Sequence, residues 1–143
     1  MTYPDPTVRA AIVQRFIPVK LDLFKDRESV RPLNVIWTPT LLFADRRGTI
    51  HYRSLNFLPP AEFLDMLDIG EAWTRLRWGE YDQAGKLLAG VRDRRPDGPF
   101  TAEAIYRRGI VAYLKTRSNP EMYAIWQELR DHFPTSIWTL RIP

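Results

Sequence analysis

The spacing of apolar residues separates the chain into a first part, up to about residue 70, and a second part with a different texture. In the first part, helix-like and strand-like periods alternate. Val8, Ile12 and Phe16 lie four residues apart, the spacing that predicts an amphipathic helix. Asp5 followed by Pro6 has the chemistry of an N-cap with proline at the first helical position, so we expect this helix to begin at Pro6.

Three further stretches of the first part predict strands. Apolar residues alternate with polar ones over residues 17–23, which is typical of a strand, and Pro18 favours a place at its edge or first position. Residues 35–45 are almost continuously apolar around Thr-Pro-Thr, as in a strand that is covered on both faces. The letters "DRRG" then predict a type I turn, and "TIHYRS" predicts a second, half-exposed strand of a hairpin.

The second part of the chain shows only helix-like spacing. Pro59 and Pro60 predict a helix start, and the buried face of this helix is expected to contain Phe63, Leu64, Met66 and Leu67. Further along, one segment has the spacing of a tetratricopeptide-like repeat at Gly79, Tyr81, Ala84 and Pro96. Asn119-Pro120 predicts the start of the last helix, by the same cap-then-proline logic, and its apolar stripe contains Met122, Ile125, Trp126, Leu129 and Phe133. Two imperfect units are fewer than a free solenoid needs, so we expect these helices to pack on the preceding sheet.

Composition narrows the chemistry that this chain can perform. Its 143 residues include no cysteine, which excludes disulfides, a thiolate nucleophile and a dithiol redox couple. The two histidines, His51 and His132, are expected at the surface or the edge of the core, so we predict no metal site and no cofactor. No apolar run approaches the ~20 residues of a membrane span. The first residues also lack the features of a secretion signal, which favours a soluble cytoplasmic protein without a membrane partner.

Charge patterning gives no sign of nucleic-acid binding or of acid–base catalysis. The formal net charge is +4, but the densest basic cluster, residues 92–95, is short and interrupted by Asp93. We therefore expect a solvated helix end and do not expect nucleic acid as a partner. Four carboxylates recur every three residues, and we expect them to form a solvated helix face rather than a catalytic pair: Glu62, Asp65, Asp68 and Glu71. We predict no catalytic residues.

Four motifs, in this order, give the chain a family resemblance. They are the helix entry "TYPDPTV", the strand "FIPVKLDL", "TPTLLFADRRG" before the hairpin turn, and "FLPPAEFLDML" at the start of the next helix. Together they resemble the later part of a thioredoxin-like domain, of the bacterial kind that carries helical repeats. The resemblance implies an α/β fold: an incomplete thioredoxin-like domain over residues 1–70, with about three strands and flanking helices, and an all-helical, tetratricopeptide-like tail over residues 71–143.

The resemblance also implies that one piece is missing. In that family the first helix begins a few residues earlier at a Cys-x-x-Cys, and a central strand precedes it. Without that strand, the segments at residues 17–23 and 40–44 lose their common neighbour and would leave backbone groups unpaired. Three arrangements would resolve this: the remaining strands pair directly, a second copy supplies the missing surface, or the natural product begins upstream of Met1.

The resemblance places a candidate binding edge at Trp37, Thr38 and Pro39. A cis Thr38-Pro39 bond would present a short backbone edge to an extended peptide, whereas the plainer interpretation of Pro39 is a turn former at a strand start. Trp73 and Trp78 are the aromatic residues that could add a surface patch. The leading hypothesis is a non-catalytic protein-binding or assembly module whose partner is a protein, a peptide or a second copy that completes the sheet. The alternative is a fragment of a thiol–disulfide oxidoreductase whose cysteines lie upstream.

Overall fold

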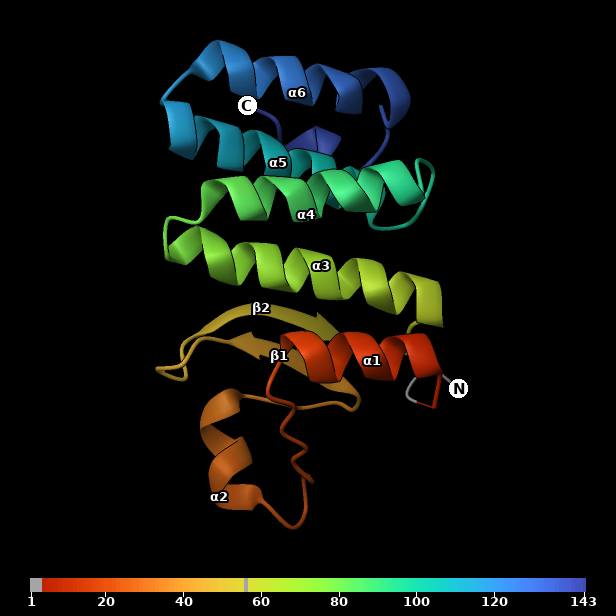
Figure 1. The fold of residues 1–143 in the computed structure, drawn as a ribbon, viewed down its shortest axis with the longest axis vertical. Coiled ribbons are helices and arrows are strands. Elements are labelled where there is room, and N and C mark those ends of the chain that lie inside the picture. Colours follow the sequence, from red (N-terminus) through yellow and green to blue (C-terminus); the bar gives the residue numbers. More distant parts are fainter. Residues whose placement is uncertain (1–3, 56) are drawn as a thin grey trace.

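The computed structural model describes residues 4–55 and 57–143, and this part of the chain forms six α-helices and one two-stranded antiparallel sheet (Figure 1). The elements, in chain order, are α1 (Pro6–Arg15), α2 (Arg27–Val30), the 3-10 turn η1 (Arg31–Leu33), β1 (Thr40–Ala44), β2 (Ile50–Leu55), α3 (Pro60–Arg77), α4 (Tyr81–Arg94), α5 (Thr101–Thr116), α6 (Asn119–His132) and the 3-10 turn η2 (Thr139–Arg141). The fold is therefore mixed α/β and mostly helical.

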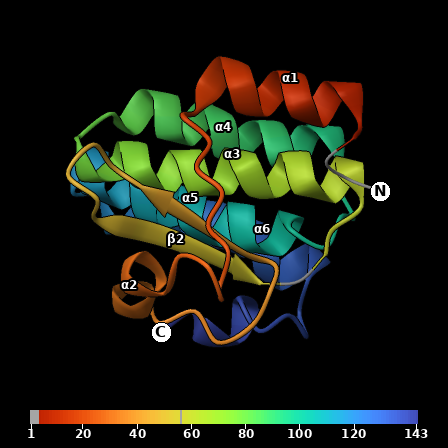
Figure 2. The same ribbon diagram turned by 90° about the horizontal axis from the view of Figure 1, so that it is seen from below.

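Helices α3 to α6 form successive layers on one side of the hairpin. Helix α3 packs on both strands, and α4, α5 and α6 each pack on the helix before them (Figure 1). Seen from below, α1 and the hairpin lie along opposite sides of α3, and both contact it (Figure 2). The sheet packs against α3, most of which precedes the predicted tail at residues 71–143, whereas α4 to α6 pack mainly on one another. A hairpin of two strands is marginally stable alone, and α3 supplies the surface that it needs.

The local signals for helix starts are largely confirmed. Asp5 caps α1, because its Oδ1 accepts hydrogen bonds from the backbone N–H groups of Thr7 (2.9 Å) and Val8 (3.0 Å), and Pro6 is the first helical residue. Pro60 opens α3 as predicted. In α6 the capping residue is Ser118 rather than Asn119, so the predicted start is displaced by one residue.

The predicted turn between the two strands is also confirmed. Asp45 Oδ1 accepts from the N–H groups of Arg47 (2.8 Å) and Thr49 (3.1 Å), and Gly48 N donates to Asp45 O (2.9 Å). Gly48 has a φ of +80°, a conformation that is inexpensive only for glycine. Phe43 lies opposite Tyr52 in the resulting ladder. The first strand is shorter than predicted, since it begins at Thr40.

The predicted strand at residues 17–23 is wrong. These residues lead from α1 into a turn without forming a strand, and they pair with no strand in the described part of the chain, so the sheet has two strands rather than about three. Ile17 and Val19 are 93% and 75% exposed. A strand requires a neighbour with which it can exchange backbone hydrogen bonds, and the alternation of apolar residues does not show whether one is present.

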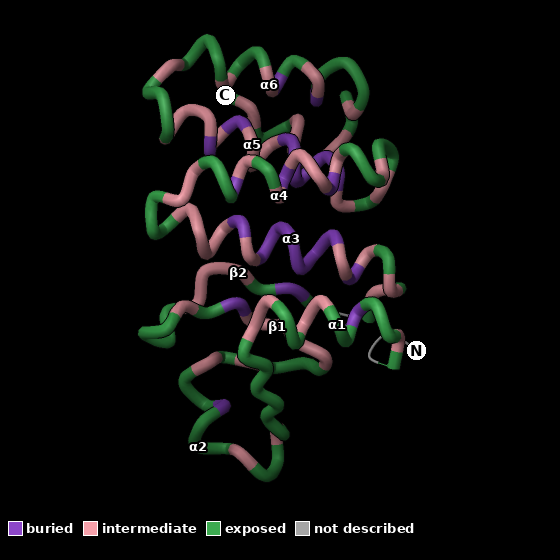
Figure 3. Tube along the Cα trace, in the orientation of Figure 1, coloured by how far each residue is buried: buried purple, intermediate pink, exposed green. Residues whose placement is uncertain are grey.

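Close helix contacts form the buried apolar core of the four stacked helices. Gly70 in α3 lies under the ring of Phe43, and Gly109 in α5 lies under the indole of Trp126, so a Cβ atom at either glycine would collide with the ring. The Trp126 Nε1–H also donates to the carbonyl of Tyr106 (2.9 Å). The prediction that Trp126 is a core residue is confirmed, and Figure 3 shows buried positions concentrated in α3, α4 and α5.

The four carboxylates of α3 are not a solvated face, contrary to the prediction. Asp65 and Asp68 are buried, and arginines from α1 and α4 contact them. Arg15 contacts Asp68 and Glu71, both at 2.6 Å. Arg94 donates to Asp65 (3.0 Å) and to Asp68. The acids face α1 and the end of α4, so they join three helices instead of meeting water.

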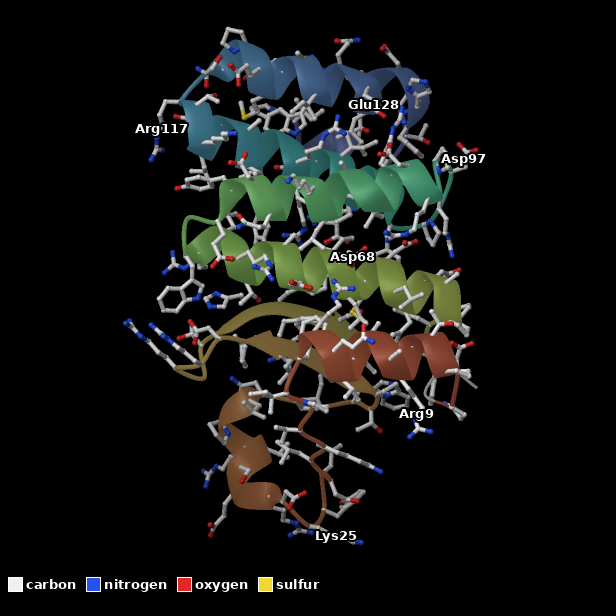
Figure 4. The ribbon with its side chains drawn as sticks, in the orientation of Figure 1. Arg9, Lys25, Asp68, Asp97, Arg117 and Glu128 are labelled. Carbon is white, nitrogen blue, oxygen red and sulfur yellow. The ribbon has the colours of Figure 1, made fainter. Side chains whose placement is uncertain are left out.

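The basic cluster at the end of α4 is likewise used within the molecule. Arg95 Nε lies 3.3 Å from Asp65 Oδ2, close enough for an ion pair although the geometry is not that of a hydrogen bond. Arg92 Nε donates to Glu128 Oε1 on α6 (2.6 Å). Figure 4 labels Asp68 of α3 and Glu128 of α6, the acidic residues that Arg94 and Arg92 contact. The prediction of a merely solvated helix end is therefore wrong.

Candidate protein-binding surface

Residues 17–39, which we call the α2 lobe, project away from the helical layers at the far side of the hairpin (Figure 1). Most positions of the lobe are exposed, in contrast to α3 (Figure 3). Exposed large apolar side chains are concentrated in the lobe and at the end of β2: Ile17, Val19, Leu21, Phe24, Ile36, Trp37, Leu55 and Phe57. An exposed apolar set of this extent is typical of a surface that binds another molecule.

Polar contacts, rather than an apolar core, organise most of the lobe. Asp22 Oδ1 accepts from the N–H groups of Phe24 (2.9 Å) and Lys25 (3.1 Å), and these two bonds hold the pKa of Asp22 below its ordinary value. Lys25 lies at the tip of the lobe (Figure 4). Val30 is the one buried apolar residue that the lobe contains.

A single arginine of the sheet holds the lobe from outside. Arg53 in β2 donates through Nη1 to the carbonyl of Asn34 (3.1 Å) and through Nη2 to the carbonyl of Leu33 (2.6 Å). Asn34 has a φ of +50°, and it ends η1 in the left-handed region. These contacts set the course of the chain into the segment that precedes β1.

The predicted binding edge lies between the lobe and β1. The Thr38-Pro39 peptide bond is cis, as the resemblance implied. Trp37 is 65% exposed and Thr38 is exposed, whereas Pro39 is half-buried. Thr40 Oγ1 donates to the carbonyl of Trp37 (2.6 Å), and a carbonyl oxygen can accept a second bond.

The outer edge of β1 is free of strand partners in the described residues. β1 pairs with β2 alone, so the backbone groups that point away from β2 meet no other strand. Such an edge is a template for an added strand. The exposed apolar side chains of the lobe and the free backbone edge thus lie in consecutive segments of the chain.

Trp73 and Trp78 have different surroundings and do not form a common patch. The guanidinium of Arg107 lies 4.2 Å from the ring centre of Trp73, 5.2 Å from that of Tyr52 and 5.4 Å from that of Trp138. Trp73 therefore helps to anchor α5 to α3 and the hairpin. Trp78, 42% exposed, is covered by Arg46 and Arg47 of the hairpin turn, at 4.9 Å and 5.3 Å.

The sequence pattern did not reveal two features near these tryptophans. Arg107 also pairs with Glu103 (2.7 Å), a buried carboxylate that the spacing did not single out. His51 Nε2 lies 3.0 Å from Asp45 Oδ2, and His51 lines a hollow of about 390 Å³. An aspartate six residues before a histidine is not a recognisable motif, so only the hairpin geometry shows this pair.

Comparison with protein-family models, with curated protein sequences and with solved structures finds no match to this chain. In the described ranges, 4–55 and 57–143, no cluster of three histidine or acidic side chains could hold a metal ion. Within the same ranges, no helix combines the length and the hydropathy that crossing a membrane requires.

Proposed function

We propose that this chain is a protein-binding module that holds an extended segment of a partner protein along the free edge of β1. The observation that carries the proposal is the position of an exposed apolar set, including Ile36 and Trp37, directly before a strand with one unpaired edge. An added strand would form backbone hydrogen bonds with β1 and place alternate side chains against the exposed apolar residues.

The free edge favours a peptide over other apolar occupants. A lipid surface or an apolar small molecule would cover Trp37 and Phe57, but it has no regular row of N–H and C=O groups to match those of β1. A polypeptide strand provides both the apolar side chains and the backbone groups. Residues 17–21, which are exposed and belong to no helix or strand, provide further apolar side chains in the same lobe for such a segment.

Thiol chemistry does not belong to this proposal. The sequence contains no cysteine, so a partner held at the Thr38-Pro39 edge could not exchange a disulfide with this chain. The alternative function, a fragment of a thiol–disulfide oxidoreductase, would use the same edge but would need a thiol pair from residues outside this sequence.

The test uses a synthetic strand peptide with alternating valine and threonine, lysine at both ends and a fluorescent label. We expect saturable binding by fluorescence anisotropy. The same peptide, N-methylated at every second residue on one edge, should bind about tenfold more weakly or worse, because it cannot form the backbone bonds. Ile36→Asp should weaken binding, and the matched control Ile137→Asp, in the C-terminal segment beyond α6, should not.

Three other outcomes decide the proposal. Concentration-dependent self-association in sedimentation, abolished by Ile36→Asp, would support the free edge with a second copy as its occupant. Equal affinity for the N-methylated and unmodified peptides would overturn it. Binding to phosphatidylcholine vesicles together with no binding of the strand peptide would also overturn it, because a lipid surface would then be the occupant.

A further inference from the structure

A second candidate site lies in the hollow of about 390 Å³ between β2, α3, α4 and α5. Its volume is within the range of small-molecule sites in proteins. Leu76 of α3 and Ile110 and Leu114 of α5 form apolar walls, and Trp73 and Tyr81 add aromatic ones. None of these residues belongs to the α2 lobe, so this hollow is separate from the protein-binding surface.

His51 provides a polar group in this hollow. Its side chain is 6% exposed, and its Nε2 is held at 3.0 Å by Asp45 Oδ2. The other oxygen of Asp45 already accepts two backbone N–H bonds, and the bond from His51 is the largest of the effects that hold the pKa of Asp45 below its ordinary value. The carboxylate therefore acts only as an acceptor, so Nε2 carries a proton and, in the neutral ring, Nδ1 is an acceptor.

The Nδ1 atom of His51 has no hydrogen-bond partner in the described part of the chain, and its side chain lines the hollow. A ring nitrogen that lines the hollow without a protein partner can accept a hydrogen bond from an O–H or N–H group of a ligand. The inner end of the hollow is therefore suited to a hydrogen-bond donor.

Arg77 gives the hollow a positive charge at its exposed side. Two residues earlier on α3, Arg75 pairs with Glu71 (2.7 Å) and Glu80 (2.6 Å). Arg77 lines the hollow, is exposed and has no acidic partner within residues 4–55 and 57–143. A free guanidinium of this kind can bind a carboxylate through two parallel hydrogen bonds.

We infer that this hollow binds a small aromatic carboxylic acid that carries a hydroxyl or N–H donor at its other end. The donor meets His51, the ring lies among the apolar and aromatic walls, and the carboxylate meets Arg77. The three parts of the ligand thus match an inner acceptor, an apolar middle and an exposed cation.

The test compares three probes that differ by one group each. 4-Hydroxyphenylacetate has both polar ends, phenylacetate lacks the hydroxyl, and 4-hydroxyphenylacetamide lacks the charge. In NMR titrations we expect 4-hydroxyphenylacetate to saturate and to shift the ring signals of His51 but not those of His132, which lies exposed on α6 and serves as an internal control. Each of the other two probes should bind about tenfold more weakly, since each loses one polar contact.

Two variants assign the loss to particular residues. Arg77→Ala should reduce affinity for the two carboxylates about tenfold and leave the amide unchanged. His51→Gln keeps a donor for Asp45 but removes the ring acceptor, so it should abolish the preference for the hydroxyl. The exposed Arg130→Ala, on α6, is the matched control. The inference is overturned if no probe saturates at millimolar concentration, if the amide binds as tightly as the acid, or if both histidines shift equally.

Discussion

The α2 lobe and the helix stack (α3 to α6) treat the same kinds of residue in opposite ways. In the stack, Ile69, Leu88 and Leu129 are fully buried, and arginines cross from one helix to another to meet carboxylates. In the lobe, Ile17 and Ile36 are 93% exposed, and an aspartate accepts a hydrogen bond from a nearby backbone N–H group, as Asp26 does from Asp22. Apolar burial is the main favourable term in folding, so the stack stabilises the fold and the lobe adds little until it is covered.

The largest expected effect is a difference in the free energy of unfolding between two substitutions, one at a buried residue of the stack and one at an exposed residue of the lobe. Leu88→Ala should lower the free energy of unfolding by about 2–5 kcal/mol, because it leaves a cavity among α3, α4 and α5. Ile17→Ala should change it by less than about 0.5 kcal/mol. Urea denaturation of both variants measures the difference. A comparable loss at Ile17 would show that the lobe is covered in solution.

The next effect concerns the buried carboxylates of α3. Arg94→Ala should cost about 1–3 kcal/mol, because Asp65 and Asp68 remain buried with fewer partners. We place the cost below that of a fully buried pair, since the Arg94 side chain is half-exposed and Arg15 still contacts Asp68. Lys115→Ala, which removes an exposed pair with Asp82, is the matched control and should leave the denaturation midpoint unchanged.

A smaller expected effect is the pH dependence of stability that the partly buried phenol of Tyr52 in β2 causes. Burial first, and the nearby Glu103 carboxylate second, raise the pKa of Tyr52 above its ordinary value of 10.0. The unfolded phenol therefore ionises at lower pH than the folded one, and the contribution of Tyr52 is present below pH 10.0 and lost above it. One pH unit above that value, the loss is about 1.4 kcal/mol.

Tyr52→Phe isolates this contribution. The variant should lose less stability than the parent chain between neutral and alkaline pH, as measured by urea denaturation at both. Tyr123→Phe is the control, because Tyr123 is 38% exposed and should leave the alkaline slope unchanged. Identical slopes for the parent chain and Tyr52→Phe would contradict the burial of the phenol beside Glu103.

Features that depend on neighbouring residues in the sequence were predictable. The cap at Asp5, the glycine of the hairpin turn at Gly48 and the proline at the start of α3 each depend on chemistry within a few residues. The stripe of α6 was equally clear, because Trp126 and Leu129 face one neighbouring helix. The position of the candidate edge at Trp37 to Pro39 followed from the same local reasoning, combined with the resemblance.

Features that depend on distant residues were not predictable. Asp68 is buried because Arg15 and Arg94, each more than twenty residues away, meet it. Residues 17–23 alternate as a strand does, but this pattern does not show whether a neighbouring strand is present, and the described residues provide none. The sequence placed Trp73 in a candidate surface patch, whereas in the structure the guanidinium of Arg107, from another helix, covers its ring. In each case the outcome depends on a partner that spacing along one segment does not contain.

The smallest expected effect on global stability tests how the lobe is attached. Arg53→Ala removes the donors to the carbonyls of Leu33 and Asn34, and because Arg53 is exposed the denaturation midpoint should hardly move. Local opening should increase, so trypsin should cut faster at Lys20 and Lys25, with fragments assigned by mass spectrometry. Arg130→Ala is the control. If cleavage is unchanged, Arg53 does not hold the lobe. The packing of the buried Val30 would then position the apolar surface that precedes β1.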